Sequence, residues 1–244
     1  MTEFTSPARP RRRAGGPPLG PLAIVTLALT VAGVLVLVLG TGSAPAPFAD
    51  AADAAWYAAH PLVVRIGALL QFGAAVPLGI LTASLYARQL HLGVRVPGPV
   101  IGLYGGITAS IALLASALVT WSLGFPGVEA DPEGTAALGR IAFALGGVGY
   151  ATGVGLLIAG VAVPALILRL IPRWLAIAGL VLAGLGELSF LSLALDPLQA
   201  LLPVVRFGGG AWLIAAAFLL PASRPKRGPQ DATGRPEPTG RTAS

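Results

Sequence analysis

The feature that most constrains this chain is a series of six apolar runs, each about as long as a lipid bilayer is thick. Of the 244 residues, 55% are hydrophobic and 11% are charged, whereas soluble domains average about 25% charged residues. A helix needs about 20 apolar residues to cross the hydrocarbon core. The predicted spans are residues 19–40, 62–86, 99–123, 135–163, 174–195 and 198–220. The sequence therefore predicts an all-α polytopic membrane bundle of six transmembrane helices.

Polar segments flank this apolar region. Residues 1–18 and 221–244 are basic and rich in proline, a composition typical of disorder. We predict a disordered cytoplasmic tail at 1–18, a six-helix transmembrane domain at 19–220 and a second disordered cytoplasmic tail at 221–244. The first run has a rival interpretation as a signal peptide, because residues 43–46 resemble a cleavage site. Its length exceeds the usual apolar core of about 7–15 residues, which favours a retained helix.

The basic residues predict the orientation of the chain. Thirteen of the sixteen lysines and arginines fall in the two tails and in two loops, at residues 87–98 and near 169–173. By the positive-inside rule, these segments and both termini are cytoplasmic. The net charge of +6 follows from this topology, so we expect the lipid bilayer, and not nucleic acid, as a partner.

The three remaining arginines lie inside spans and suggest an internal repeat. Arg65, Arg140 and Arg206 each lie in the outer part of an even-numbered span, and prolines stand near the start of each odd-numbered span. This pattern predicts three repeated helical hairpins. An arginine at the bilayer centre costs at least about 2.5–3.5 kcal/mol. Two interpretations stay open: the side chains extend to outer-leaflet phosphates, or they ring an outer vestibule that binds a small anion or a lipid headgroup.

The last predicted hairpin holds one acid and one base. Glu187 lies nine residues before Asp196, where the two apolar runs meet, and Arg206 lies ten residues after it. In an antiparallel hairpin the two residues have the same depth, and an intramembrane charge normally takes a partner. We predict an interhelical ion pair between Glu187 and Arg206. It would serve either as a structural clamp or as a gate or ligand anchor.

Small and aromatic residues predict how the helices pack. Glycines at helix-face spacing allow close helix approach. They are Gly102 and Gly106 in the third span, and Gly146, Gly149, Gly153 and Gly160 in the fourth. Trp212 lies in the middle of the sixth span, so its indole N–H needs a partner inside the bundle. Trp56 and Tyr57 are placed where an interfacial aromatic belt would lie.

The sequence offers no catalytic constellation. There are no cysteines, and the two histidines, His60 and His91, lie just beyond opposite ends of the second span. HExxH, GxSxG and Walker motifs are absent. We therefore predict no catalytic residues, no metal site and no cofactor. The sequence favours a protein without enzymatic activity and leaves open an enzyme that acts on lipids, for which it offers no motif.

One segment is similar to a known family. The text RLIPRWLAIAGL, which begins at Arg169, and the His60-Pro61-Leu62 opening of the second span with Arg65 after it resemble bacterial six-helix membrane proteins grouped as domain of unknown function 4386. The resemblance could cover residues 19–220. It implies a six-span fold in a bacterial inner membrane and implies no activity. From the residues alone, Pro172 is expected near a helix start and Trp174 at an interface.

Three functional interpretations follow. The first is an integral membrane protein of unknown molecular function. The second is a small transporter or channel that binds an anionic ligand or a lipid headgroup at Arg65, Arg140, Arg206 and Glu187. The third is an accessory or stress-response subunit that packs against a membrane partner or a second copy of itself.

Overall fold

The computed structural model describes residues 17–42 and 53–223, which form a helical bundle without strands. Six stretches are long and apolar enough to cross a membrane: Leu19–Thr41, Pro61–His91, Gly98–Ser122, Pro132–Ile167, Arg173–Leu193 and Asp196–Leu219. The predicted fold class is confirmed, and the predicted spans agree to within a few residues at each end. The chain is therefore a multi-pass membrane protein. The predicted tails and the alternative cleavage site lie largely outside the described residues.

Two of the six spans are interrupted by a π-helical turn, and two contain 3-10 turns. The first three spans are single helices: α1 (Leu19–Thr41), α3 (Pro61–His91) and α4 (Gly98–Ser122). The fourth is α5 (Pro132–Phe143), the π-helical turn η2 (Ala144–Gly149) and α6 (Tyr150–Ile167). The fifth is α7 (Arg173–Leu188) with the 3-10 turn Ser189–Leu193. The sixth is the 3-10 turn Asp196–Ala200, α8 (Leu201–Pro203), the π-helical turn η5 (Val204–Gly208) and α9 (Gly209–Leu219).

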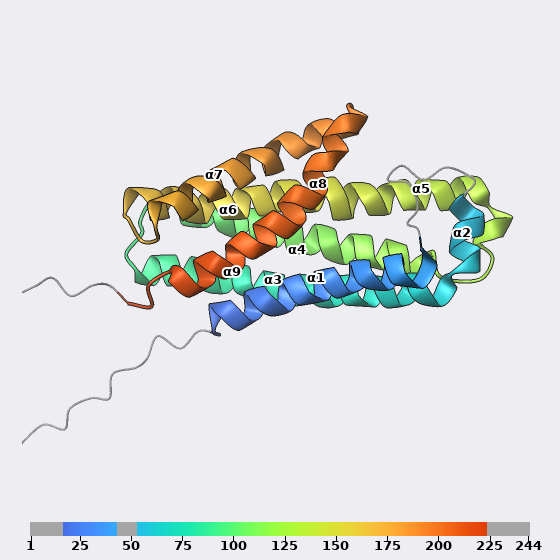
Figure 1. The fold of residues 1–244 in the computed structure, drawn as a ribbon, viewed down its shortest axis with the longest axis horizontal. Helices are drawn as coiled ribbons and strands as arrows, with labels where there is room; N and C mark the ends of the chain where they lie inside the picture. The colour runs from blue at the N-terminus through green and yellow to red at the C-terminus, as the bar shows by residue number, and fades with distance from the viewer. Residues whose placement is uncertain (1–16, 43–52, 224–244) are drawn as a thin grey trace, which may run out of the picture.

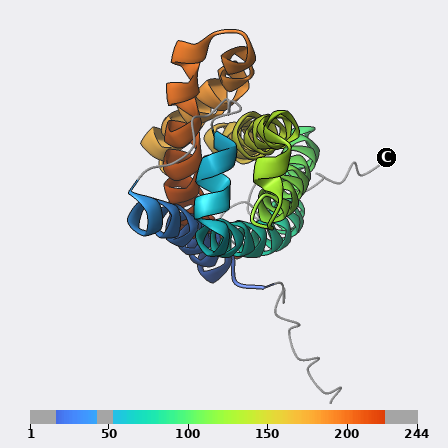
Figure 2. The same ribbon diagram turned by 90° about the vertical axis from the view of Figure 1, so that its right-hand side faces the viewer.

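Successive spans run in opposite directions, so the bundle has two chemically distinct ends (Figure 1). The start of α1 and the end of α9 meet at one end, where Gly20 lies against the ring of Phe218. We call it the basic end, since its loops and helix ends carry Arg88, Arg95, Arg169 and Arg173. The opposite, acidic end carries Asp53, Glu129, Asp131 and Glu133, and the turn between α7 and α8, which begins the sixth span at Asp196, points toward it. A short helix, α2 (Asp53–Ala59), lies across the acidic end (Figure 2).

The third hairpin differs from the first two. Helices α1 and α3 pack along their length, as do α4 and α6. By contrast, α7 packs mainly on α6, and α9 packs mainly on α1. Toward the acidic end, α7 and α8 stand away from the rest of the bundle (Figures 1 and 2). The predicted three hairpins therefore hold for the direction of the chain, while the last hairpin leans away from the other two toward the acidic end.

Glycines bring α4 and α6 into direct backbone contact. A Cβ atom on Gly153 would lie 2.6 Å from the backbone N of Ala109 and 2.8 Å from the carbonyl O of Gly105. Gly160, about two turns after Gly153 and closer to the basic end, meets Gly102 in the same way. The predicted role of these glycines in close packing is confirmed. Gly106, in contrast, faces Thr82 of α3.

Some local boundaries differ from the prediction. The fourth span continues past its predicted end at residue 163, because α6 runs through Pro164 to Ile167. The second span also continues further than predicted, to His91. Pro172 directly precedes α7, as expected, and Trp174 is exposed at the basic end.

Trp212 joins α9 to α7. Its indole N–H donates a 2.7 Å hydrogen bond to the carbonyl of Leu175, which confirms the expected partner inside the bundle. We expect Trp212→Phe to lower the free energy of unfolding by about 1–2 kcal/mol, because the hydrogen bond and part of the packing are lost. Trp174→Phe, at an exposed position, is the matched control and should change little. Equal effects of the two changes on thermal unfolding in detergent would contradict the assignment.

Candidate functional site

Arg206 lies where the two π-helical turns meet. It belongs to η5, and its Nη2 donates a 3.0 Å hydrogen bond to the carbonyl O of Gly146 in η2. The guanidinium carbon lies 4.9 Å from the ring centroid of Tyr150, the first residue of α6. π-Helical turns are rare and are found frequently at functional sites, where they redirect side chains and backbone groups. Two such turns therefore fix the half-buried arginine in the middle of the bundle.

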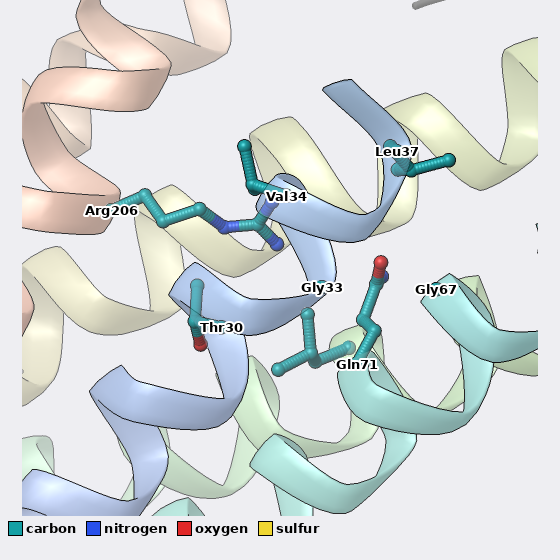
Figure 3. A pocket seen from close by; sticks show the side chains of 8 residues that line it. Thr30, Gly33, Val34, Leu37, Gly67, Gln71 and Arg206 are labelled. Carbon is teal, nitrogen blue, oxygen red and sulfur yellow. The ribbon is translucent and has the colours of Figure 1, made fainter. Parts of the chain in front are cut away.

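Three neighbouring cavities share Arg206 in their walls. The largest has a volume of about 370 Å³ and lies among α1, α3, α4, α5, η2 and α8. A second, of about 70 Å³, lies between α1 and α3, and Figure 3 shows Arg206 pointing into it from one side. The third, of about 10 Å³, continues toward α9. A cavity of about 300–1,000 Å³ is typical of a small-molecule site, so the largest one is a candidate. We call the three together the Arg206 cavity.

The walls of the Arg206 cavity are mainly apolar. The larger part is lined by Val34, Leu37, Phe143, Leu202 and Phe207, and Arg206 is the one charged side chain among the described residues that line it. Polar groups reach it from Gln71, Ser116, Thr120 and Tyr150. An apolar chamber with a few polar groups is the usual arrangement of a ligand site.

Helix α2 covers the acidic end of the cavity. Trp56 and Tyr57 line it, and Tyr57 packs with Val64 and Leu123. Burial, with a smaller contribution from Asp53, raises the pKa of Tyr57 to about 12. The phenol therefore stays neutral at physiological pH and suits an apolar wall. The prediction of an interfacial belt was wrong for Tyr57, which is buried, because α2 folds back over the bundle.

A hydrogen-bonded chain crosses three helices beside Arg206. The amide Nε2 of Gln71 on α3 donates to Ser116 Oγ on α4 at 2.9 Å. Ser116 Oγ donates in turn to the carbonyl O of Ala142 on α5 at 2.7 Å. Gly146 leaves room for this chain, since a Cβ there would lie 3.0 Å from Gln71 Nε2. Ser116 was not among the predicted site residues, although the polar character of Gln71 and Ser116 in apolar spans was an available signal.

The other two arginines lie elsewhere. The Nε of Arg65 donates to the carbonyl of Pro61 at 3.3 Å, and its guanidinium carbon lies 5.5 Å from the ring centroid of Phe125. Arg140 is exposed on α5. Neither residue lines the Arg206 cavity. The structure therefore does not gather the three arginines into one vestibule, because only Arg206 is turned into the bundle.

Glu187 and Arg206 are not brought together either. Glu187 lies near the end of α7 beside Gly155 of α6, and its buried Oε1 has no hydrogen-bond partner among the described residues. Arg206 instead bonds to Gly146 and lies over Tyr150. The prediction rested on equal depth alone. Helix α7 does pack on the sixth span, where a Cβ on Gly208 would lie 3.2 Å from Leu182, but Glu187 and Arg206 are turned toward different residues of the fourth span. Glu187 and Arg206 can therefore have the same depth in the membrane without being in contact.

Neither a family model, nor a curated protein, nor a solved structure matches this chain.

Proposed function

We propose that this membrane protein binds the anionic head of an amphiphile at Arg206. The observation that carries this proposal is a guanidinium, turned toward an apolar cavity, whose neighbours leave its charge unbalanced. Arg206 lies ten residues beyond Asp196, or about 15 Å along a helix, in a hydrocarbon core of about 30 Å. A charge at that depth normally faces a partner of opposite charge.

Among the residues that the structure describes, the contacts of Arg206 do not supply an opposite charge. The Gly146 carbonyl takes one hydrogen bond, and a guanidinium has five N–H donors. The Tyr150 ring offers a π face to the cation. Carboxylate and phosphate groups match the remaining fork of donors in shape and charge. An anion is therefore the complementary ligand.

The shape of the site favours an amphiphile over an inorganic ion. The larger part of the cavity, about 370 Å³, has mostly apolar walls, which stabilise a hydrocarbon tail by burial. Its walls include α1 and α8, which diverge toward the acidic end (Figure 1). A lipid-dissolved chain would enter between these helices. By the positive-inside rule the acidic end would face outward, in the bacterial inner membrane that the family resemblance implies. Binding there would be the first step of transport or sensing.

The proposal is tested with radiolabelled dodecanoate on the purified protein in nanodiscs. We expect saturable binding that Arg206→Gln weakens at least about tenfold, because a charged hydrogen-bond partner is lost. Arg140→Gln, at an exposed arginine outside the cavity, is the matched control and should bind like the wild type. Methyl dodecanoate, which lacks the anion, should not distinguish the wild type from Arg206→Gln.

A structural role for Arg206 is the competing interpretation, since its bond to Gly146 joins the two π-helical turns. In that case Arg206→Gln lowers the melting temperature, and the wild type binds no dodecanoate above the level of empty nanodiscs. That result would overturn the proposed function.

A further inference from the structure

The wall opposite Arg206 carries a second polar group, the amide of Gln71. Both side chains line the 70 Å³ part of the cavity, and Figure 3 shows them reaching toward it from opposite sides. Gln71 comes from the middle of α3 and Arg206 from η5. A group bound to Arg206 in this space therefore meets Gln71.

The hydrogen-bonded chain fixes which end of the Gln71 amide faces the cavity. The carbonyl of Ala142 can only accept, so the hydroxyl proton of Ser116 is committed to it. Ser116 Oγ then has lone pairs but no proton for Gln71. Only Nε2 can bond to it, at the observed 2.9 Å, because the opposite orientation would place two acceptors in contact. The positions of Nε2 and Oε1 are therefore assigned from their hydrogen-bond partners.

The Oε1 atom of Gln71 is consequently the group left for a ligand. No described residue donates a hydrogen bond to it, and it is not among the buried polar atoms without a partner. It is thus accessible from the cavity and is an acceptor only. The site presents a cationic donor on one wall and a neutral acceptor on the other.

Building on the proposed function, we infer that Gln71 selects amphiphiles carrying a hydrogen-bond donor beside the anionic group. The ligand class is a single-chain amphiphile whose carboxylate or phosphate has an adjacent N–H or O–H, such as an N-acyl amino acid. The anion binds Arg206, the donor binds Gln71 Oε1, and the chain lies against Leu37 and Phe207.

The volumes fit this class. The part between Arg206 and Gln71, about 70 Å³, has room for about two groups of water size, at about 30 Å³ each. The larger part, about 370 Å³, has room for about a dozen such groups. A compact polar head fits the smaller part, and a chain of about twelve carbons fits the larger part.

The test uses a pair of probes that differ in one hydrogen-bond donor. N-lauroylglycine has an amide N–H next to its carboxylate, and N-lauroylsarcosine carries a methyl group in place of that hydrogen. We expect the wild type in nanodiscs to bind N-lauroylglycine about tenfold more tightly, because the other probe leaves Oε1 unpaired. Gln71→Met, which keeps the side-chain length without the acceptor, should remove this preference and leave binding of N-lauroylsarcosine unchanged.

Two further variants keep the test decisive. Gln71→Glu places a carboxylate opposite Arg206, so both probes should bind at least about tenfold more weakly. Gln199→Met, at a glutamine bonded to Asp196 outside the cavity, should keep the wild-type preference. Equal binding of the two probes to the wild type, with both lost in Arg206→Gln, would overturn the role of Gln71 and leave the anion site standing. Binding of neither probe would instead overturn the proposed function.

Discussion

Replacing Gly153 by valine is expected to prevent stable folding of the bundle. The new Cβ would lie 2.6 Å from the backbone N of Ala109 and 2.9 Å from its Cα. These are backbone atoms of α4, so no side chain can rotate away to make room. Helices α4 and α6 would have to separate along their contact. Overpacking a core usually costs about 1–3 kcal/mol and sometimes more, and here we expect a loss above about 3 kcal/mol.

The matched control for Gly153→Val is the same change at Gly184. A Cβ on Gly184 of α7 meets nothing within 4 Å, so Gly184→Val should change the stability by less than about 1 kcal/mol. Monodisperse yield and thermal unfolding in detergent measure both variants. A Gly153→Val protein with the melting temperature of the wild type would show that α4 and α6 do not touch at this point.

The second large effect is expected at Ser116. Ser116→Ala leaves the Ala142 carbonyl and the Gln71 amide without their partner. Each buried group that loses its hydrogen bond costs about 1–3 kcal/mol. We expect the free energy of unfolding to fall by about 2–4 kcal/mol, although the change removes a single oxygen atom. The free energy of unfolding is measured by titrating a denaturing detergent into protein held at a constant concentration of a lipid-like detergent.

Ser84→Ala is the control for this change, because the hydrogen bond from Ser84 to Ile80 O of its own helix is exposed to solvent or lipid. It should alter the stability by less than about 0.5 kcal/mol. The double variant Ser116→Ala, Gln71→Met should cost less than the sum of the single changes, since neighbours that share a bond are not additive. Strict additivity would mean that the two side chains act independently.

The spans could be predicted from the sequence because lipid imposes one simple requirement on each of them. A run of about 20 apolar residues must form a helix to pair its own backbone groups, and α1 begins at Leu19 as predicted. Two further features were predictable because a side chain's size and hydrogen-bond donors are properties of its residue type. They are the close packing at Gly153 and Gly160 and the internal partner of Trp212.

The Arg206 cavity could not be predicted in this way. It depends on the π-helical turns η2 and η5 and on the divergence of α8 from α1, and these are tertiary features that no periodicity in the sequence reveals. Depth alone suggested that Glu187 would meet Arg206. The rotation of each helix about its axis decides the contact, and a π-helical turn changes that rotation. Ser116 was missed because a small hydroxyl in a span is ordinary until its partners are known.

The contact between the beginning of α1 and the end of α9 determines when the cavity can form during synthesis. Gly20 and Phe218 lie together in the finished protein, yet the ribosome makes them about 10–40 s apart at roughly 5–20 residues per second. The α1 wall at Val34 and Leu37 must therefore remain in lipid, incomplete, until the last span arrives. Arg206 belongs to that last span, so its charge enters the membrane after the helices that form the other walls of the cavity have been inserted.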